Sequence, residues 1–172
     1  MAASPKTSDA LSGTYLIALG SNRPHHHYGR PEGVVRAAME EIAALGMVAA
    51  RSNVAQTPPL GPARRRFANA ALVLESELAP PSLLAALKRM EREFGRRGAQ
   101  RWGDRVLDCD IILWSGGIWR SAGLAIPHRE LRNRAFVLGP AAAIAPDWRD
   151  PASGFSLAHC NARLTRARPL PR

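Results

Sequence analysis

The stretch RWGDRVLDCDIILW, residues 101–114, contains the most informative strand of the chain. Its last four residues, IILW (111–114), are apolar and partly β-branched, which predicts a buried strand. Asp108 and Asp110 stand two apart at the head of that strand, so their carboxylates point to the same face, roughly 6–7 Å apart. Two like charges beside a core are costly unless a positive charge lies between them. The sequence therefore predicts a cation at this place.

Two identities for that cation remain open from these residues alone. Mg²⁺ prefers oxygen ligands and is commonly held by one or two carboxylates together with waters and substrate phosphates. The alternative is a pair of salt bridges to Arg101 and Arg105, which lie just before the strand. The Asp-x-Asp spacing is compatible with both.

The rest of the chain predicts a single α+β domain with a ferredoxin-like βαββαβ core, a mainly antiparallel sheet, and flanking helices packed on one face. The predicted order is strand 14–20, helix 33–45, strand 47–57, strand 67–77, helix 80–94 and strand 108–114, followed by short helical segments within 123–146. Around a domain spanning residues 14–160, residues 1–13 are predicted to be a disordered leader. Residues 161–172 are predicted to form a basic, mobile tail.

The bulk composition narrows the class of protein. The chain has 172 residues, 46% of them hydrophobic, which is long and apolar enough to bury one core. No apolar run is long enough to span a bilayer and no secretory signal pattern is present, so the expected location is the cytoplasm. The net charge is +10, and every basic residue except Lys6 and Lys88 is arginine. This bias suits a phosphate-bearing partner, but it also arises in arginine-rich proteomes.

A loop rich in glycine and arginine precedes the aspartate strand. Its glycines allow movement, and arginines brought onto a polyphosphate would neutralise the charge of a transferring group. Trp102 in the same loop would cover a flat heterocycle. The loop arginines are Arg96, Arg97, Arg101 and Arg105. A solvated charged loop is the alternative, but two neighbouring carboxylates favour the functional interpretation.

Two histidine features are weaker signals. His128 lies among arginines in IPHRELRNR (126–134) and would suit phosphate oxygens, although by itself an ordinary surface histidine explains it better. The run 25–27, three consecutive histidines, has no second cluster at metal-ligand spacing and is interpreted as incidental. The phosphate-binding pattern G-x-x-x-x-G-K-[ST] is absent from the sequence, so ATP chemistry would need another scaffold.

Taken together, several segments resemble the 6-hydroxymethyl-7,8-dihydropterin pyrophosphokinase family. The most specific are RWG-x-R-x-LD-x-D and PH-x-x-x-x-NR-x-F-x-L, and the resemblance covers residues 14–148. The matching segments are ALGSN (18–22), TPPLGP (57–62), FANAAL (67–72), the block from GRR to LDCDI (95–111) and IPHRELRNRAFVL (126–138). The resemblance implies that residues 14–160 form one pyrophosphokinase domain. Such an enzyme transfers the diphosphate of ATP to the hydroxymethyl group of 6-hydroxymethyl-7,8-dihydropterin and releases AMP, in folate biosynthesis.

The same resemblance implies roles for individual residues. Asp108 and Asp110 would hold two Mg²⁺ ions that bridge the ATP phosphates, and Asp110 would help to take the hydroxyl proton. The implied catalytic residues are Arg96, Arg97, Arg105 and Asp110. The implied ATP contacts are Lys88, Glu91, Arg105, Ile111, His128, Arg129 and Arg134. The implied pterin contacts are Thr57, Pro58, Leu60, Phe67 and Asn69, with the ring stacked between Trp102 and Phe136.

Some positions depart from the commoner family pattern. Phe67 stands where tyrosine is frequent, Lys88 where glutamine is frequent, Ala125 where threonine is frequent and Arg129 where tyrosine is frequent. None of these changes removes a metal ligand, so activity is expected. The implied partners are ATP and the pterin, with no nucleic acid, no membrane and a monomeric state.

Two rival functions differ from the implied one in class. A basic nucleic-acid-binding domain of the same shape would want paired exposed aromatic side chains on its sheet, and FANAALVL (67–74) offers none. The other rival is a related scaffold that binds nucleotide without transferring phosphate. Turnover separates that case from an enzyme.

Overall fold

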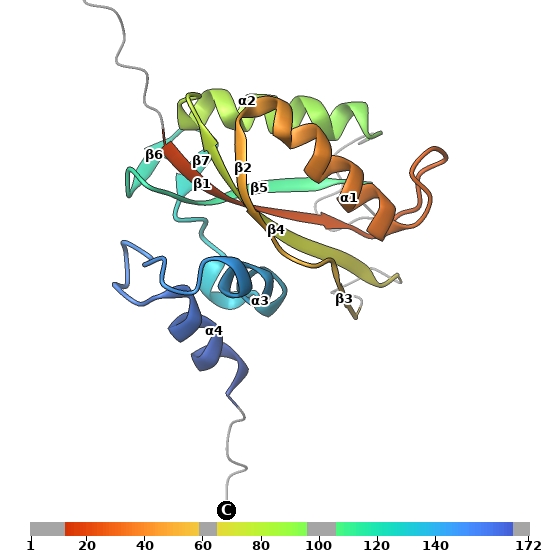
Figure 1. The fold of residues 1–172 in the computed structure, drawn as a ribbon. Helices are drawn as coiled ribbons and strands as arrows, with labels where there is room; N and C mark the ends of the chain where they lie inside the picture. Colours follow the sequence, from red (N-terminus) through yellow and green to blue (C-terminus); the bar gives the residue numbers. More distant parts are fainter. Residues whose placement is uncertain (1–12, 59–64, 96–105, 167–172) are drawn as a thin grey trace, which may run out of the picture.

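The centre of the fold is an antiparallel sheet built from both halves of the chain (Figure 1). The computed structural model describes residues 13–58, 65–95 and 106–166. The strands are β1 Gly13–Ser21, β2 Met47–Arg51, β3 Ala55–Thr57, β4 Phe67–Ser76 and β5 Asp108–Trp114. Their order is β2-β4-β1-β5, with β3 also paired to β4. With β1 and β4 central, this is the ferredoxin-like arrangement, and that prediction is confirmed.

Helices cover both faces of the sheet: the two helices of the βαββαβ core lie on one face, as predicted, and two later helices cover the other. Helices α1 Pro31–Ile42 and α2 Pro80–Glu93 cover one face, and α3 Ala135–Ile144 and α4 Leu157–Thr165 lie on the other (Figure 1). Two hydrophobic clusters result. The first cluster, under α1 and α2, includes Ile17, Leu72 and Leu87. The second, under α3 and α4, includes Leu16, Ile112 and Leu138.

A β-bulge in β5 decides which way its carboxylates point. Leu16 pairs with Leu113 and Ile17 pairs with Ile111, which leaves Ile112 as an extra residue. Ahead of the bulge, Cys109 and Ile111 both belong to the first cluster. Because strand side chains alternate between faces, Asp108 and Asp110 lie on the opposite face, the one that carries α3.

Other elements differ from the predicted ones at their ends or between them. The predicted strand 47–57 is divided into β2 and β3. The division falls at Ser52, whose hydroxyl takes the place of a ladder partner by accepting from Ala71 N at 2.9 Å. Helix α1 begins at Pro31, as proline at the first turn favours, and continues into the 3-10 helix η1 Ala43–Leu45. The hairpin of β6 Trp119–Ser121 and β7 Leu124–Ile126 was not predicted, while the 3-10 helix η2 Leu131–Asn133 falls within the short helical segments expected in 123–146.

The two ends of the described chain also differ from expectation. Strand β1 already includes Gly13, and α4 continues through 161–165, which the sequence assigns to a mobile tail. Helix α4 is stabilised at its start because Ser156 Oγ accepts from His159 N at 3.2 Å. Among the residues that the structure describes, no helix is long and apolar enough to cross a membrane.

Candidate functional site

Asp110 lies where three segments of the chain meet at the edge of the sheet. Its strand, β5, is the outermost one on that side of the described sheet. Lys88 Nζ, from α2, lies 3.5 Å from Asp110 Oδ1, and His128 Nε2, from the segment after β7, lies 3.8 Å from Asp110 Oδ2. The side chains of Asp110 and His128 are 29% and 24% exposed, so solvent and ligands can reach them. Asp108, two residues earlier on the same face, is also half-buried.

Lys88 and Glu91 hold the outer edge of β5 through the peptide groups of Cys109. Cys109 N donates to Glu91 Oε1 at 2.7 Å, and Lys88 Nζ donates to Cys109 O at 2.8 Å and to Glu91 Oε1 at 2.6 Å. An edge strand presents unpaired peptide groups, and here two helix side chains satisfy them. The Glu91 side chain is fully buried, so its described role is to anchor the strand, and the implied ATP contact of Glu91 stays a prediction.

The charge of Lys88 is secure at neutral pH. Burial, the largest single influence, acts to lower the pKa of Lys88, but the attraction of Asp110 and Glu91 together outweighs it and the pKa is raised. Burial also raises the pKa of the Cys109 thiol well above its usual value. Cys109 is therefore an inert core thiol rather than a nucleophile.

His128 presents a proton donor to the site. Its Nδ1 accepts from Glu130 N at 3.2 Å, so the neutral ring carries its proton on Nε2, the atom that faces Asp110. Its backbone N donates to Ile112 O at 2.9 Å, which fixes the segment against β5. Burial lowers the pKa of His128, and the Asp110 carboxylate opposes this only in part. The ring is therefore neutral at pH 7 and donates from Nε2.

The implied pterin residues on β3 and β4 lie on the same face of the sheet as the aspartates. Asn69 on β4 is 4% exposed, and its Nδ2 donates to Thr57 Oγ1 at 2.8 Å, which fixes the orientation of the amide. Phe67 pairs with Thr57 across β3 and β4. Three of the implied pterin contacts, Thr57, Phe67 and Asn69, are thus brought together.

A row across three strands connects this amide to the aspartates. Gly20 on β1 pairs with Asn69 on one side and with Asp108 on the other. Neighbouring strands are about 4.8 Å apart, so Asn69 and Asp108 stand about 10 Å apart with only a glycine between them. The next residue on that face, Ala18, pairs with Asp110. The sheet therefore has a floor of small residues between the amide and the carboxylates. We call this floor, Ala18 and Gly20, the small-residue floor.

Arg134 and Phe136 lie at the start of α3. The Arg134 guanidinium is 5.7 Å from the centre of the Phe136 ring, a cation–π geometry, and both side chains are half-buried. The Ile111 side chain is buried in the first cluster, so the structure leaves only its main chain for an ATP contact. Arg129 and Pro58 are exposed.

Part of the implied site lies outside the described residues. This holds for the implied residues Leu60, Arg96, Arg97, Trp102 and Arg105, and for Arg101 of the salt-bridge alternative. The sequence did not predict that Lys88 and His128 lie beside Asp110, and it did not predict the small-residue floor. The motif ALGSN (18–22) carried the signal for the floor, because two small residues alternate in it on one face of a strand.

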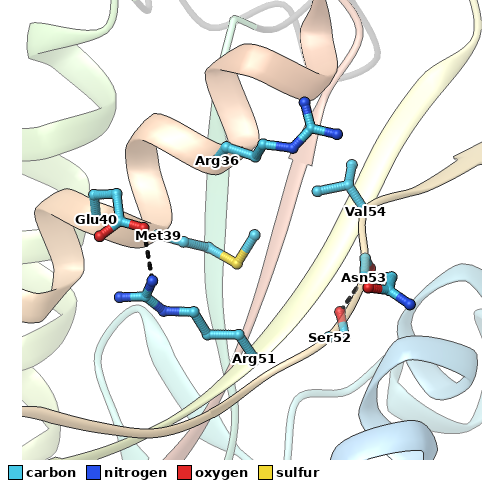
Figure 2. Close-up of a pocket in the computed structure, with 7 residues that line it drawn as sticks. All are labelled: Arg36, Met39, Glu40, Arg51, Ser52, Asn53 and Val54. Atoms are coloured by element: carbon cyan, nitrogen blue, oxygen red, sulfur yellow. Dashed lines mark hydrogen bonds and ion pairs between the residues drawn. The ribbon is translucent and has the colours of Figure 1, made fainter.

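A cavity of about 470 Å³ lies elsewhere, between α1 and the connection from β2 to β3 (Figure 2). It is lined by Arg36, Met39, Glu40, Arg51, Ser52, Asn53 and Val54. An ion pair between Arg51 Nη1 and Glu40 Oε1, 2.6 Å long, bridges one end. Strand β2 is at the opposite edge of the sheet from β5, and none of the implied site residues that the structure describes lines this cavity.

Comparison with known proteins places this geometry in a family. Residues 16–146 match the model of the 7,8-dihydro-6-hydroxymethylpterin-pyrophosphokinase family. Relatives named 2-amino-4-hydroxy-6-hydroxymethyldihydropteridine pyrophosphokinase include those of Methylorubrum extorquens and Pseudomonas aeruginosa. The first is 40% identical over 134 residues, 76% of this chain and 82% of the relative. The second is 40% identical over 138 residues, 78% of this chain and 82% of the relative.

Other similar proteins match over a smaller share of their length. The Synechocystis relative of the same name is 42% identical over 97 residues, which are 56% of this chain and only half of the relative. The crystal structure of Plasmodium falciparum HPPK-DHPS wild type with pteroate matches with a TM-score of 0.67 at 10% identity, over 88% of this chain and 42% of that chain. At that identity the likeness shows the fold alone. From the family match and the bacterial relatives, the chain belongs to the 7,8-dihydro-6-hydroxymethylpterin-pyrophosphokinase family.

Proposed function

We propose that the chain transfers the diphosphate of ATP to the hydroxymethyl group of 6-hydroxymethyl-7,8-dihydropterin, releasing AMP, as a step of folate biosynthesis. The names of its bacterial relatives support this reaction. Within the structure, the strongest support is the row in which Gly20 pairs with both Asn69 and Asp108. A flat heterocycle that is hydrogen-bonded to the amide of Asn69 would lie over the small-residue floor and extend toward Asp108 and Asp110. We expect the chain to act as a monomer in the cytoplasm.

The reaction exchanges one phosphorus–oxygen bond for another. The hydroxymethyl oxygen attacks the β-phosphorus, and the bond from that phosphorus to the oxygen bridging the α- and β-phosphates breaks. AMP leaves with the bridging oxygen, and the hydroxyl gives up its proton. Asp110 would take this proton, while Nε2 of His128 and the guanidinium of Arg134 would bind phosphate oxygens. Lys88 would add a fixed positive charge beside them.

The donor set fits Mg²⁺. Asp108 and Asp110 offer carboxylate oxygens on one face, and neither is fully buried. Within residues 13–58, 65–95 and 106–166, no group of three or more His, Cys, Asp or Glu side chains could hold a metal ion. Two carboxylates without further protein ligands suit Mg²⁺, which keeps waters and takes phosphate oxygens, and they do not suit a structural Zn²⁺. Two Mg²⁺ ions bound with ATP would neutralise phosphate charge, and the two aspartates would hold them.

The test is AMP formation from ATP, Mg²⁺ and the reduced hydroxymethylpterin. AMP should appear only when the pterin is present, and Asp110→Asn should lower the rate by about a hundredfold to a thousandfold, the scale on which one preorganised electrostatic contact acts. The matched control is Asp147→Asn, since Asp147 is an exposed aspartate in the connection from α3 to α4. This control should retain the wild-type rate. Absence of AMP at high enzyme concentration, or AMP formation that ignores the pterin, would refute the proposal.

A further inference from the structure

A fully buried carboxylate outside the implied site holds the segment that carries two of the implied ATP contacts. Asp150 has no exposed surface. Arg132 Nε donates to its Oδ2 at 2.7 Å, and Arg132 Nη2 forms an ion pair with the same oxygen at 2.6 Å. Ser153 Oγ also donates to Oδ2, at 2.6 Å, and Ala152 N donates to Oδ1 at 3.0 Å. Both oxygens are satisfied, as a buried charge requires.

The backbone around Asp150 is itself fixed to the body of the protein. Asp150 N donates to Phe155 O at 2.9 Å, and Leu157 N donates to Trp148 O at 2.9 Å. Leu157 is fully buried in the second cluster, at the start of α4. The connection between α3 and α4 is therefore tied across itself and packed on the sheet. Its carboxylate is a fixed point to which another segment can bind.

Arg132 is the middle residue of η2, and the implied ATP contacts lie on either side of it. Leu131 N donates to His128 O at 3.0 Å, so the turn that leads into η2 begins at His128. Arg134 ends η2 and caps α3, where Leu138 N donates to its carbonyl at 3.0 Å. Leu131 is fully buried, so packing holds this residue of η2, and the ion pair holds the next one, Arg132. Two anchors at consecutive residues of one helical turn, which point in different directions, fix its rotation.

We propose that Asp150 is a positioning residue of the ATP site, which acts through Arg132 to hold His128 and Arg134 in the orientation that binds phosphate. The inference rests on the ATP contacts proposed for these two residues. No atom of Asp150 needs to touch a substrate. Its effect should therefore be larger on ATP binding than on pterin binding, because Thr57 and Asn69 lie on β3 and β4, away from η2, whereas Phe136 follows Arg134 on α3.

The test compares kinetic constants of Asp150→Asn with those of the wild-type chain. Asparagine keeps the size and the hydrogen-bonding oxygen but removes the charge that binds Arg132. We expect the KM for ATP to rise about tenfold, which corresponds to about 1.4 kcal/mol. The KM for the pterin should rise by clearly less than the KM for ATP, because of the pterin contacts among the described residues only Phe136 follows η2 closely in the chain. The matched control is Glu40→Gln, which removes the Arg51–Glu40 pair at the other edge of the sheet and should change neither constant.

A second comparison separates positioning from general stabilisation. In an Arg134→Met background, Asp150→Asn should raise the KM for ATP by clearly less than in the wild-type background, because part of what it positions is gone. Arg132→Lys keeps the charge but loses the fork, and Arg132 is 42% exposed, so this variant tests the same pair with little risk to folding. It should give an intermediate KM.

The outcomes distinguish the inference from the proposed function. If neither His128→Ala nor Arg134→Met changes the KM for ATP, the proposed ATP contacts fail and the positioning role falls with them. If either variant raises the KM but Asp150→Asn and Arg132→Lys do not, the positioning role alone is refuted. Equal effects of Asp150→Asn in both backgrounds would also refute it.

Discussion

Replacement of Lys88 by methionine tests the central electrostatic claim about the site. Methionine keeps the length and the apolar stem of the side chain and removes the ammonium. Three contacts disappear, to Glu91 Oε1 at 2.6 Å, to Cys109 O at 2.8 Å and to Asp110 Oδ1 at 3.5 Å. The buried Glu91 carboxylate and the edge of β5 then each lose a partner.

The size of the effect follows from distance and burial. Two unit charges 3.5 Å apart attract by about 5 kcal/mol at an effective dielectric constant of about 20 and by about 1 kcal/mol in bulk water. Removal of one partner from a buried pair costs roughly 3–5 kcal/mol, because it leaves an uncompensated charge. Lys88 is 29% exposed while Glu91 is fully buried, which favours the lower end, about 3 kcal/mol. For a chain of this size, that loss lowers the Tm by about 6–12 °C.

Urea unfolding followed by tryptophan fluorescence measures this loss. The matched control is Arg89→Met, since Arg89 is an exposed cation one residue along the same helix, and its replacement should cost less than about 0.5 kcal/mol. In a Glu91→Gln background, Lys88→Met should cost clearly less than in the wild type, because the buried charge it compensates is gone. A loss below about 1 kcal/mol, or one equal to that of Arg89→Met, would refute the claim that Lys88 compensates these carboxylates.

Two further predictions concern the small-residue floor and the loss of stability at acid pH. A Cβ on Gly20 would come within 3.3 Å of Asn69 Oδ1, so Gly20→Val should raise the KM for the pterin by about tenfold or more. Gly20→Ala should raise it less, and an unchanged KM for the pterin in both variants would contradict the floor. Hydrogen bonds from Ser153, Ala152 and Arg132 together outweigh burial, the largest single influence, so the pKa of Asp150 is lowered from its ordinary 3.8. This stabilisation is complete above pH 3.8 and is lost as the pH falls through the lowered pKa, so the stability difference between the wild type and Asp150→Asn should shrink in that acid range. A difference that does not depend on pH would show that the charge of Asp150 is not what stabilises the fold.

The sequence predicts those elements in which apolar residues recur at a clear helical or strand spacing. Strand β5 and helix α2 follow from apolar spacing alone, because both bury one continuous face. The three-residue strands β6 and β7 are too short to show a period. The break between β2 and β3 depends on the bond from Ala71 N to Ser52 Oγ, which joins residues 19 apart. No pattern within a short stretch of sequence indicates a bond between residues so far apart.

The sequence also does not indicate that α3 packs on the second face of the sheet. The segment AFVLGPAAAI (135–144) is apolar on every side, so its period does not say which surface it covers. In the site, Asp108 and Asp110 could be found because two charges interrupt an apolar strand. The partners of Asp110 could not, because Lys88 and His128 come from elements on either side of β5 in the chain and meet it only after folding.

The alternation of side chains along β5 assigns stability and chemistry to different residues of one strand. Cys109 and Ile111 fill the first cluster, while Asp108 and Asp110 lie partly exposed on the opposite face, where the proposed ligands would bind. The two roles are nevertheless coupled through Lys88, whose ammonium binds both the peptide group of Cys109 and the carboxylate of Asp110. A cation that takes Asp110 from Lys88 leaves the bonds to Cys109 and Glu91 in place, so the edge of the strand stays anchored while the carboxylate changes partner. The ion pair with Asp110, at 3.5 Å, is the longest of the three contacts that Lys88 makes. It is therefore the weakest of them and the one most easily given up. At the proposed metal site, Glu91 would thus keep Lys88 in place when Asp110 bound a metal ion, which would explain why a third carboxylate is buried beside the two partly exposed ones.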